Sequence, residues 1–189
     1  RIGNTGIIIS IVIAAIIVIV WFLNQPSIDR LLKQEFLKVK VDEYKISKRK
    51  VSMDDIKGFP AIVQQYLKYT GSLEKEIPYN LIMSMSGLFR TNPKQSWIKS
   101  KTTQFNFLPN PTRLFIIRLR ILGIFSMTGK DIYSNGRGYM LGNFIRLKKL
   151  FDESGEEFDI GELTTFLNDI VLVCPGGLIT IRENLKWTE

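Results

Sequence analysis

The segment IFSMTGKDIYSNGRGYMLGNFIRL (residues 124–147) decides the fold, because alternating polar and apolar residues lie on both sides of Asn135-Gly136. Asn-Gly between two alternating stretches is the strongest short-range signal of a β-hairpin, since both residues tolerate the positive φ angles of a tight turn. The segment therefore predicts two antiparallel strands that are joined at residues 135–136.

The residues before this hairpin alternate in the same way. Three further stretches of period-two hydrophobicity are separated by the turn sequences TNPK (91–94) and PNPT (109–112). They are LIMSMSGLF (81–89), SWIKSKTTQFNFL (96–108) and RLFIIRLRI (113–121). Because short turns join neighbouring antiparallel strands, we expect an antiparallel meander.

Alternation also sorts the side chains of these strands onto two faces of the sheet. One face collects long apolar and aromatic side chains. We take the following residues of this face as candidates for ligand binding: Met83, Met85, Phe105, Phe107, Phe115, Met127, Asp131 and Tyr133. The other face is polar, with residues such as Ser84, Gln104 and Arg118. The apolar face must be covered, either by helices of the domain, which is the simpler explanation, or by an apolar, lipid-like ligand.

Asp131 differs from its neighbours on the apolar face, because a carboxylate beside apolar side chains needs either a partner or a raised pKa. A hydrolase-like site would be built around this residue. The alternative is an ion pair with a Lys or Arg near the edge of the sheet, which is the commoner fate of such a carboxylate.

Helical patterns flank the strands on both sides. The segment from Pro60 to Thr70 has an apolar stripe, with Pro60 in the first turn and Gly71 as a C-cap. After the strands, Asp159 and Glu162 have the spacing of a capping box that opens a helix from Ile160 to Val173. We prefer this cap to a paired-carboxylate active site, and we expect the helix to cover the sheet.

The stretch GIIISIVIAAIIVIVWFL (6–23) has eighteen residues without a charge. A helix of this length spans about 27 Å, close to the thickness of the hydrocarbon core of a bilayer. The uncharged run exceeds the usual core of a signal peptide, and no small-x-small cleavage site follows it, so we expect an uncleaved single-pass membrane anchor. Its orientation stays open. Basic residues after the anchor favour a cytoplasmic domain, whereas a basic N-terminus lost before Arg1 would reverse that assignment.

The residues that follow the anchor are rich in positive charge. A short helix beginning after Ser27 is expected to lie on the membrane surface. Between residues 28 and 50 there are eight basic and four acidic residues. The candidate membrane-surface residues are Lys45, Lys48, Arg49 and Lys50. A basic segment beside a membrane helix attracts anionic lipids, and a solvated linker is the alternative.

Composition narrows the classes of function. The 26 Lys and Arg exceed the 18 Asp and Glu, and the formal net charge of +8 suits an anionic partner. We do not expect nucleic acid, because the basic residues are not interleaved with aromatics and no binding motif is present. The chain lacks histidine and has one cysteine, Cys174, which argues against imidazole catalysis, disulfides and Cys-rich metal clusters. We therefore expect no catalytic constellation, no metal and no cofactor.

Five segments carry a resemblance to a known family. They are FPAIVQQYLKYTG (59–71), SGLFR (86–90), SWIKSKTTQFNFLPNPTRLF (96–115), GKDIYSNGRGYMLG (129–142) and GEEFDIGELTTFL (155–167). Their order resembles an uncharacterised bacterial family, domain of unknown function number six five four four, many of whose members have an N-terminal membrane segment. The chain departs from the usual Phe-x-Trp at Phe115-Ile116-Ile117 and from Arg-Tyr-Leu at Thr165-Phe166-Leu167. The resemblance implies a membrane-anchored protein and no particular activity.

Together these patterns predict an α+β protein with an N-terminal transmembrane helix and a curved antiparallel β-sheet, or half-barrel, packed on one or two helices. In shape this looks like lipoprotein carriers of the LolA type. We divide the chain into a truncated N-terminal flank (1–5), the transmembrane helix (6–23), a basic juxtamembrane segment (24–56) and an α+β domain (57–189). The stretch ITIRENLKWTE (179–189) reads as the start of further sheet, so we expect this domain to be truncated at its C-terminus.

The leading hypothesis is a membrane-tethered domain that binds an apolar or lipid-like ligand between sheet and helix. One alternative is a hydrolase-like enzyme around Asp131. The other is a membrane scaffold that uses the basic juxtamembrane segment. The expected partners are membrane lipid and an apolar ligand, and the sequence does not indicate an oligomeric state.

Overall fold

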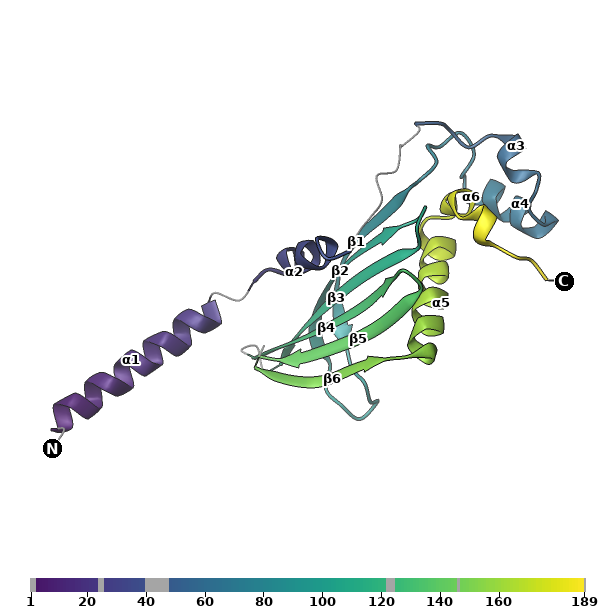
Figure 1. Cartoon of the computed structure of the whole chain (residues 1–189). Coiled ribbons are helices and arrows are strands. Elements are labelled where there is room, and N and C mark those ends of the chain that lie inside the picture. The colour runs from purple at the N-terminus through teal and green to yellow at the C-terminus, as the bar shows by residue number, and fades with distance from the viewer. Residues whose placement is uncertain (1–2, 24–25, 40–47, 122–124, 146, 189) are drawn as a thin grey trace.

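The computed structural model describes residues 3–23, 26–39, 48–121, 125–145 and 147–188. Within them the chain forms an antiparallel sheet with helices on both of its faces and at one of its ends (Figure 1). The α-helices are α1 (Asn4–Leu23), α2 (Ile28–Phe36), α3 (Met53–Ile56), α4 (Ala61–Tyr69), α5 (Glu156–Val173) and α6 (Gly177–Thr180). The predicted α+β class is confirmed.

Six strands make up the sheet, in the order β1-β2-β3-β4-β5-β6, and each pairs antiparallel with the next. They are β1 (Asn80–Phe89), β2 (Ile98–Phe107), β3 (Thr112–Ile121), β4 (Phe125–Ser134), β5 (Arg137–Phe144) and β6 (Lys148–Ser154). Asn135 and Gly136 form the turn between β4 and β5, with φ angles of 53° and 75°. The predicted meander and hairpin are therefore confirmed, and β6 is a strand that the sequence reading missed.

The strand register corrects the predicted apolar face. Residues directly opposite each other on neighbouring strands point to the same side of a sheet. Gln104 lies opposite Met83 and Phe115, so Gln104 belongs to the apolar face. Phe105 and Phe107, which we expected there, point to the other side. The other six candidate residues, Met83, Met85, Phe115, Met127, Asp131 and Tyr133, share one face as predicted.

The two faces of the sheet carry different helices. α5 packs on the face that holds Asp131, mainly against β5, and α2 packs on the opposite face against β2 and β3. On that side the ring of Phe36 meets the ring of Phe105 edge to face, with 5.1 Å between the ring centroids. The Ser27 side chain caps α2 as predicted, but the helix lies on the sheet, where we expected it on a membrane surface.

The predicted capping box of Asp159 and Glu162 is wrong. α5 begins at Glu156, with Gly155 as N-cap, so both acidic residues lie inside the helix. Asp159 accepts a hydrogen bond from the backbone N–H of Gly138 at 2.7 Å, and Glu162 bonds Arg113. These carboxylates therefore connect α5 to the sheet.

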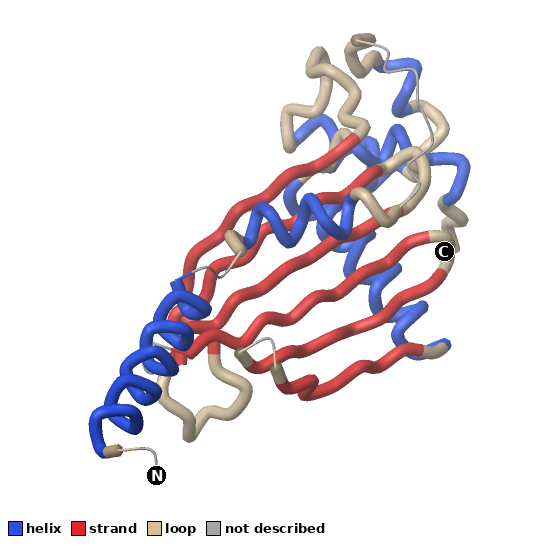
Figure 2. Tube along the Cα trace, turned by 60° about the vertical axis from the view of Figure 1, so that its left-hand side comes forward, coloured by secondary structure: helices blue, strands red, loops and turns tan. Residues whose placement is uncertain are grey.

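A helical unit stands at one end of the sheet, which we call the α4 end (Figures 1 and 2). Its apolar core joins Val51, Ile56 and Leu67 to Phe166 and Ile170 of α5. Val51 and Ile56 thus belong to the folded domain, although we assigned them to the juxtamembrane segment. The C-terminal residues form α6 and a 3₁₀ turn (Arg182–Asn184) where we expected the start of a strand.

α1 projects from the opposite end of the molecule, which we call the α1 end (Figures 1 and 2). The β1–β2 and β5–β6 connections lie at this end of the sheet. The side chains that the structure describes in α1 run from Gly6 to Ile19 and include Trp21. Counted over the described residues of the chain, no helix is long and apolar enough to cross a membrane.

Candidate functional site

A cluster of polar side chains is buried between the sheet and α5. Arg113 of β3 occupies its centre, with Nη1 at 2.7 Å from Glu162 Oε2 and Nε at 3.1 Å from Asp169 Oδ2. Asp169 also accepts hydrogen bonds from Gln104 at 2.5 Å and from Asn106 at 3.2 Å. We call these five residues the carboxylate cluster. It fixes the middle of α5 to the β2 and β3 strands at the α4 end.

Asp131 lies next to this cluster on β4, opposite Phe115 and Met140. Burial and the negative charge of Glu162 raise the pKa of Asp131 to about 6, although the positive charge of Arg113 opposes the shift. Burial also raises the pKa of Glu162 against the effect of Arg113. Within the described part of the chain, we find no hydrogen bond or ion pair to the Asp131 carboxylate. The ion pair that we considered for Asp131 is thus not among the described interactions.

The chemistry open to this arrangement is proton transfer near neutral pH, because a carboxyl group with a pKa of about 6 exists in both forms there. Its neighbour Glu162 is already held by Arg113. Among the described residues, no group of three or more Asp, Glu, His or Cys side chains could hold a metal ion.

The rest of the same face forms a second feature. α5 crosses the half of the strands near the α4 end and leaves the half near the α1 end uncovered (Figure 1). The side chains there are apolar and partly exposed, and we call them the open apolar patch: Met83, Met85, Ile117, Ile121, Phe125, Met127 and Phe144. The rings of Phe125 and Phe144 lie 6.1 Å apart at the strand ends. The patch therefore reaches the end of the sheet from which α1 projects.

The predicted ligand residues are divided among these features. Met83, Met85 and Met127 belong to the open apolar patch, whereas Tyr133 is buried near α5. Phe115 lies under the guanidinium of Arg113, which is 4.9 Å from the centre of its ring. Phe105 and Phe107 are on the α2 face and cannot contribute to the same site.

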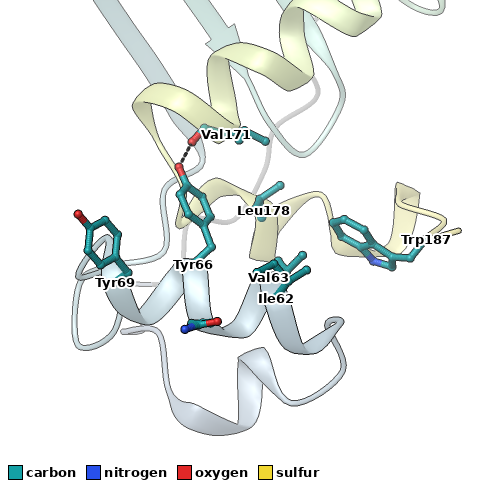
Figure 3. Close-up of a pocket in the computed structure, with 8 residues that line it drawn as sticks. Ile62, Val63, Tyr66, Tyr69, Val171, Leu178 and Trp187 are labelled. Atoms are coloured by element: carbon teal, nitrogen blue, oxygen red, sulfur yellow. Dashed lines mark hydrogen bonds between the residues drawn. The ribbon is translucent and has the colours of Figure 1, made fainter. Parts of the chain in front are cut away.

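A pocket with apolar walls lies at the α4 end of the molecule. Its volume is about 650 Å³, and its walls come from α4, the end of α5, α6 and Trp187 (Figure 3). The hydroxyl of Tyr66 points across it and donates to the carbonyl of Val171 at 2.5 Å (Figure 3). The sequence predicted the apolar stripe of α4 but not this pocket, since α4 is far from α5 and α6 in sequence, with Tyr66 and Val171 separated by 105 residues.

The candidate membrane-surface residues that the structure describes lie near α3. Lys48 and Lys50 are exposed, and Arg49 is held by both carboxylate oxygens of Asp55 at 2.7 Å. Lys45 is outside the described residues. The backbone of Arg49 bonds Ile77 in the helical unit, so this segment belongs to the α4 end. A membrane-surface role for these residues stays a prediction.

Four basic residues that the sequence reading did not select gather on the α2 face near the α1 end. Lys99 and Lys101 of β2 are two residues apart, so their side chains point to the same face of the sheet. The same holds for Arg118 and Arg120 of β3. The signal was available, because both pairs have a period of two on neighbouring strands. We placed Arg118 on the polar face, but our candidate membrane-surface residues came only from the segment after the anchor.

Comparison with known proteins places most of this domain in one family. Residues 49–189 match a family of unknown function, DUF6544. The chain belongs to this family. The match confirms the resemblance to this family, and the matched range includes α3, α4, the sheet, α5 and α6. No curated protein and no solved structure matches the chain.

Proposed function

We propose that this DUF6544 protein is a membrane-tethered domain that binds an apolar, lipid-like ligand on its open apolar patch. The observation that carries the proposal is the position of α5, which covers only part of the apolar face. Met85 remains 48 % exposed on the uncovered part. Contiguous exposed apolar surface marks a binding or membrane-contact site, and methionine side chains adapt to flexible ligands.

The tether is α1. Its sequence carries no charge from Gly6 to Leu23, and its large apolar side chains between Ile7 and Ile19 are exposed on all sides of the helix. A helix that is apolar all round needs an apolar environment, because water would otherwise contact every one of these side chains. A lipid environment for α1 supports the choice of a lipid-like ligand, since the open apolar patch extends to the same end of the domain.

The tether is tested by alkaline carbonate extraction of membranes that contain the full chain. We expect the protein to stay in the membrane pellet. Replacing Ile13 and Ile16 by lysine should release it, because each central charge costs about 3 kcal/mol on insertion. The matched control replaces both residues by leucine and should change nothing. Release of the unaltered chain would contradict the tether.

The ligand is tested by native mass spectrometry of the full chain purified from membranes. We expect a bound lipid and at least about a tenfold loss of it in the M85Q/M127Q variant, because burial of one methionine contributes about 1.5 to 3 kcal/mol. The control is I82Q. Ile82 is on the same strand as Met85 but points to the α2 face, where it is 67 % exposed.

The apolar pocket of Figure 3 is a second place for the same class of ligand, favoured by its volume of about 650 Å³ and its apolar walls. The I62Q variant tests it, because Ile62 lies on the pocket wall and is largely exposed. Loss of lipid in I62Q alone would move the ligand to this pocket. Equal lipid content in M85Q/M127Q and in the unaltered chain would overturn the site on the open apolar patch.

A further inference from the structure

Four cations face one another on the α2 side of the sheet. In the register of β2 and β3, Lys99 lies directly opposite Arg120, and Lys101 lies directly opposite Arg118. Like charges in directly opposite positions of a sheet repel each other and are unfavourable. Within the described residues, Lys99, Lys101 and Arg120 form no ion pair that would offset this repulsion. An anion bound between the two strands would do so.

The four cations line a pocket of about 700 Å³, which we call the basic pocket. Its other walls come from the start of α2, from β1 and from one further residue of β2. These residues are Ser27, Ile28 and Asp29 at the start of α2, Ser86, Gly87 and Leu88 of β1, and Ser100 of β2. Among the lining residues that the structure describes, Asp29 is the single acidic one, so the four cations leave a net charge of +3. The volume lies in the range of pockets that hold small molecules or lipid headgroups.

Arg118 joins the basic pocket to the start of α2. Its Nη2 donates a hydrogen bond to the carbonyl oxygen of Pro26 at 2.7 Å. This contact holds the first turn of α2 over the strands, and the side chains of Leu88 and Ile28 add apolar surface at the rim. The pocket therefore combines fixed positive charge with an apolar border.

The position of the basic pocket relative to α1 suggests the source of its ligand. Ser27 in the pocket wall follows the last residue of α1, Leu23, by four residues, and four residues span at most about 14 Å. With α1 in a bilayer, the pocket would lie within or next to the headgroup layer. Lysine and arginine bind phosphate oxygens through charge-assisted hydrogen bonds, and the hydroxyl of Ser86 could add another donor.

We propose that the basic pocket binds the phosphate of an anionic lipid headgroup at the membrane surface, an inference that rests on the tether in the proposed function. The occupant is a lipid phosphate and not the phosphate backbone of a nucleic acid. Among the described residues, no aromatic side chain lines the pocket, whereas proteins that bind single strands stack the bases on aromatic rings.

The experiment uses the full chain in lipid nanodiscs of phosphatidylcholine with a tenth of phosphatidic acid, a ratio of about 9 to 1 that tests selectivity under excess neutral lipid. Native mass spectrometry then counts the lipids that stay bound on release from the disc. We expect the ratio of phosphatidic acid to phosphatidylcholine among the bound lipids to exceed their ratio in the disc at least about tenfold, because each basic residue near an anionic headgroup contributes measurably to its binding. The variant K99Q/K101Q/R120Q should lose this enrichment. Arg118 is left in place because it also positions α2.

The matched control is K68Q/K75Q/K186Q, which removes three exposed lysines at the α4 end and should retain the full enrichment. Equal enrichment in the two triple variants would overturn the proposal. A second arm titrates the full chain in detergent with inorganic phosphate. Binding of free phosphate that depends on the three residues, without any lipid enrichment, would also overturn the lipid headgroup as the source. Failure of the tether would be distinct, because the protein would then not enter the nanodiscs.

Discussion

The guanidinium of Arg113 and the carboxylate of Glu162 meet at 2.7 Å, and this contact joins β3 to α5. Both side chains are almost fully buried, with 6 % and 9 % of their surfaces exposed. A buried charge that loses its partner is costly, because neither water nor another group replaces the interaction. The position of α5 over the apolar face, which defines the open apolar patch, therefore depends on Arg113.

We expect Arg113→Ala to lower the free energy of unfolding by about 3 to 5 kcal/mol, because it leaves Glu162 and Asp169 buried without their cation. Urea unfolding of the full chain in detergent, followed by circular dichroism, measures this change. The control is Arg137→Ala. Arg137 also links the sheet to α5, through Asp159 at 3.0 Å, but it is 81 % exposed, so we expect a loss of at most about 1 kcal/mol. Similar losses in the two variants would contradict the argument.

Glu35 holds α2 on the opposite face through two lysines of different burial. Its side chain is 2 % exposed and accepts hydrogen bonds from Lys130 of β4 and from Lys38. Burial acts to raise the pKa of Glu35, but the two ammonium groups outweigh it and lower the pKa. Lys130 is 15 % exposed and Lys38 is 66 % exposed.

We expect Lys130→Met to release α2 from the sheet, because the buried Glu35 would lose its inner cation. Hydrogen exchange of the α2 amides should become faster by at least about tenfold, since one ion pair of this kind contributes more than 1.4 kcal/mol. Lys38→Met should change the exchange little, as expected for an exposed pair. If both variants leave α2 equally protected, Lys130 does not hold it.

Local sequence patterns predicted most of the strands. Period-two alternation and turn residues such as Asn135-Gly136 act over a few residues, so β1 to β5 and the β4–β5 turn could be recognised directly. β6 was missed because its sequence KKLFDES is mostly charged. It is an edge strand in which only Phe151 is partly buried, so no alternation marks it.

The error on the apolar face arose from the length of one loop. Phe107 pairs with Thr112 across the four residues 108–111, so odd-numbered residues of β2 lie opposite even-numbered residues of β3. Phe105 consequently lies opposite Leu114, on the α2 face. The residues Pro-Asn-Pro indicate a turn but do not fix how many residues it contains, and a change of one residue moves every side chain to the other face.

The capping-box error has a similar cause. A spacing of three residues, as between Asp159 and Glu162, fits the capping box of a helix N-terminus. It fits just as well two positions inside a helix that lie one turn apart and face the sheet. The distinction depends on Gly138 and Arg113, which bond these carboxylates and lie more than 20 residues earlier in the chain. The carboxylate cluster could not be found from local spacing for the same reason.

Two glycines should respond in opposite ways to replacement by alanine. A Cβ atom at Gly138 would overlap with the backbone of α5, with the carbonyl carbon of Phe158 only 2.7 Å away. Because backbone cannot rotate aside, we expect Gly138→Ala to cost about 1 to 3 kcal/mol. Gly161 lies inside α5, and apart from its chain neighbours and the nearby backbone of α5 no heavy atom of the described residues is within 4 Å of such a Cβ, so Gly161→Ala should add up to about 1 kcal/mol. Thermal unfolding midpoints that shift in the same direction would show that the close approach of Gly138 to α5 is wrong.

Asp131 should make the protein less stable as the pH rises. Its pKa of about 6 in the folded state lies above its ordinary value of 3.8, so the folded state binds more protons than the unfolded state between these two pH values. The free energy of unfolding therefore falls from about pH 4 to about pH 6. Above about pH 6 the Asp131 carboxyl group causes no further change. The Asp131→Asn variant cannot ionise, so it should lack this decline.

We expect Asp131→Asn to match the unaltered chain near pH 4 and to exceed its free energy of unfolding above pH 6, by at most about 3 kcal/mol, since one pKa unit corresponds to about 1.4 kcal/mol. The gain should be smaller to the extent that water reaches this half-buried carboxylate and screens it. Urea unfolding at pH 4, 5, 6 and 7.5 (a series of about four points across the transition) measures the difference. The control is Asp152→Asn on β6, where the carboxylate is exposed and bonds Lys149 at 2.6 Å, and it should not raise the free energy of unfolding at pH 7.5. A variant at Asp131 that retains the slope of the unaltered chain would show that this carboxyl group is not the one that titrates.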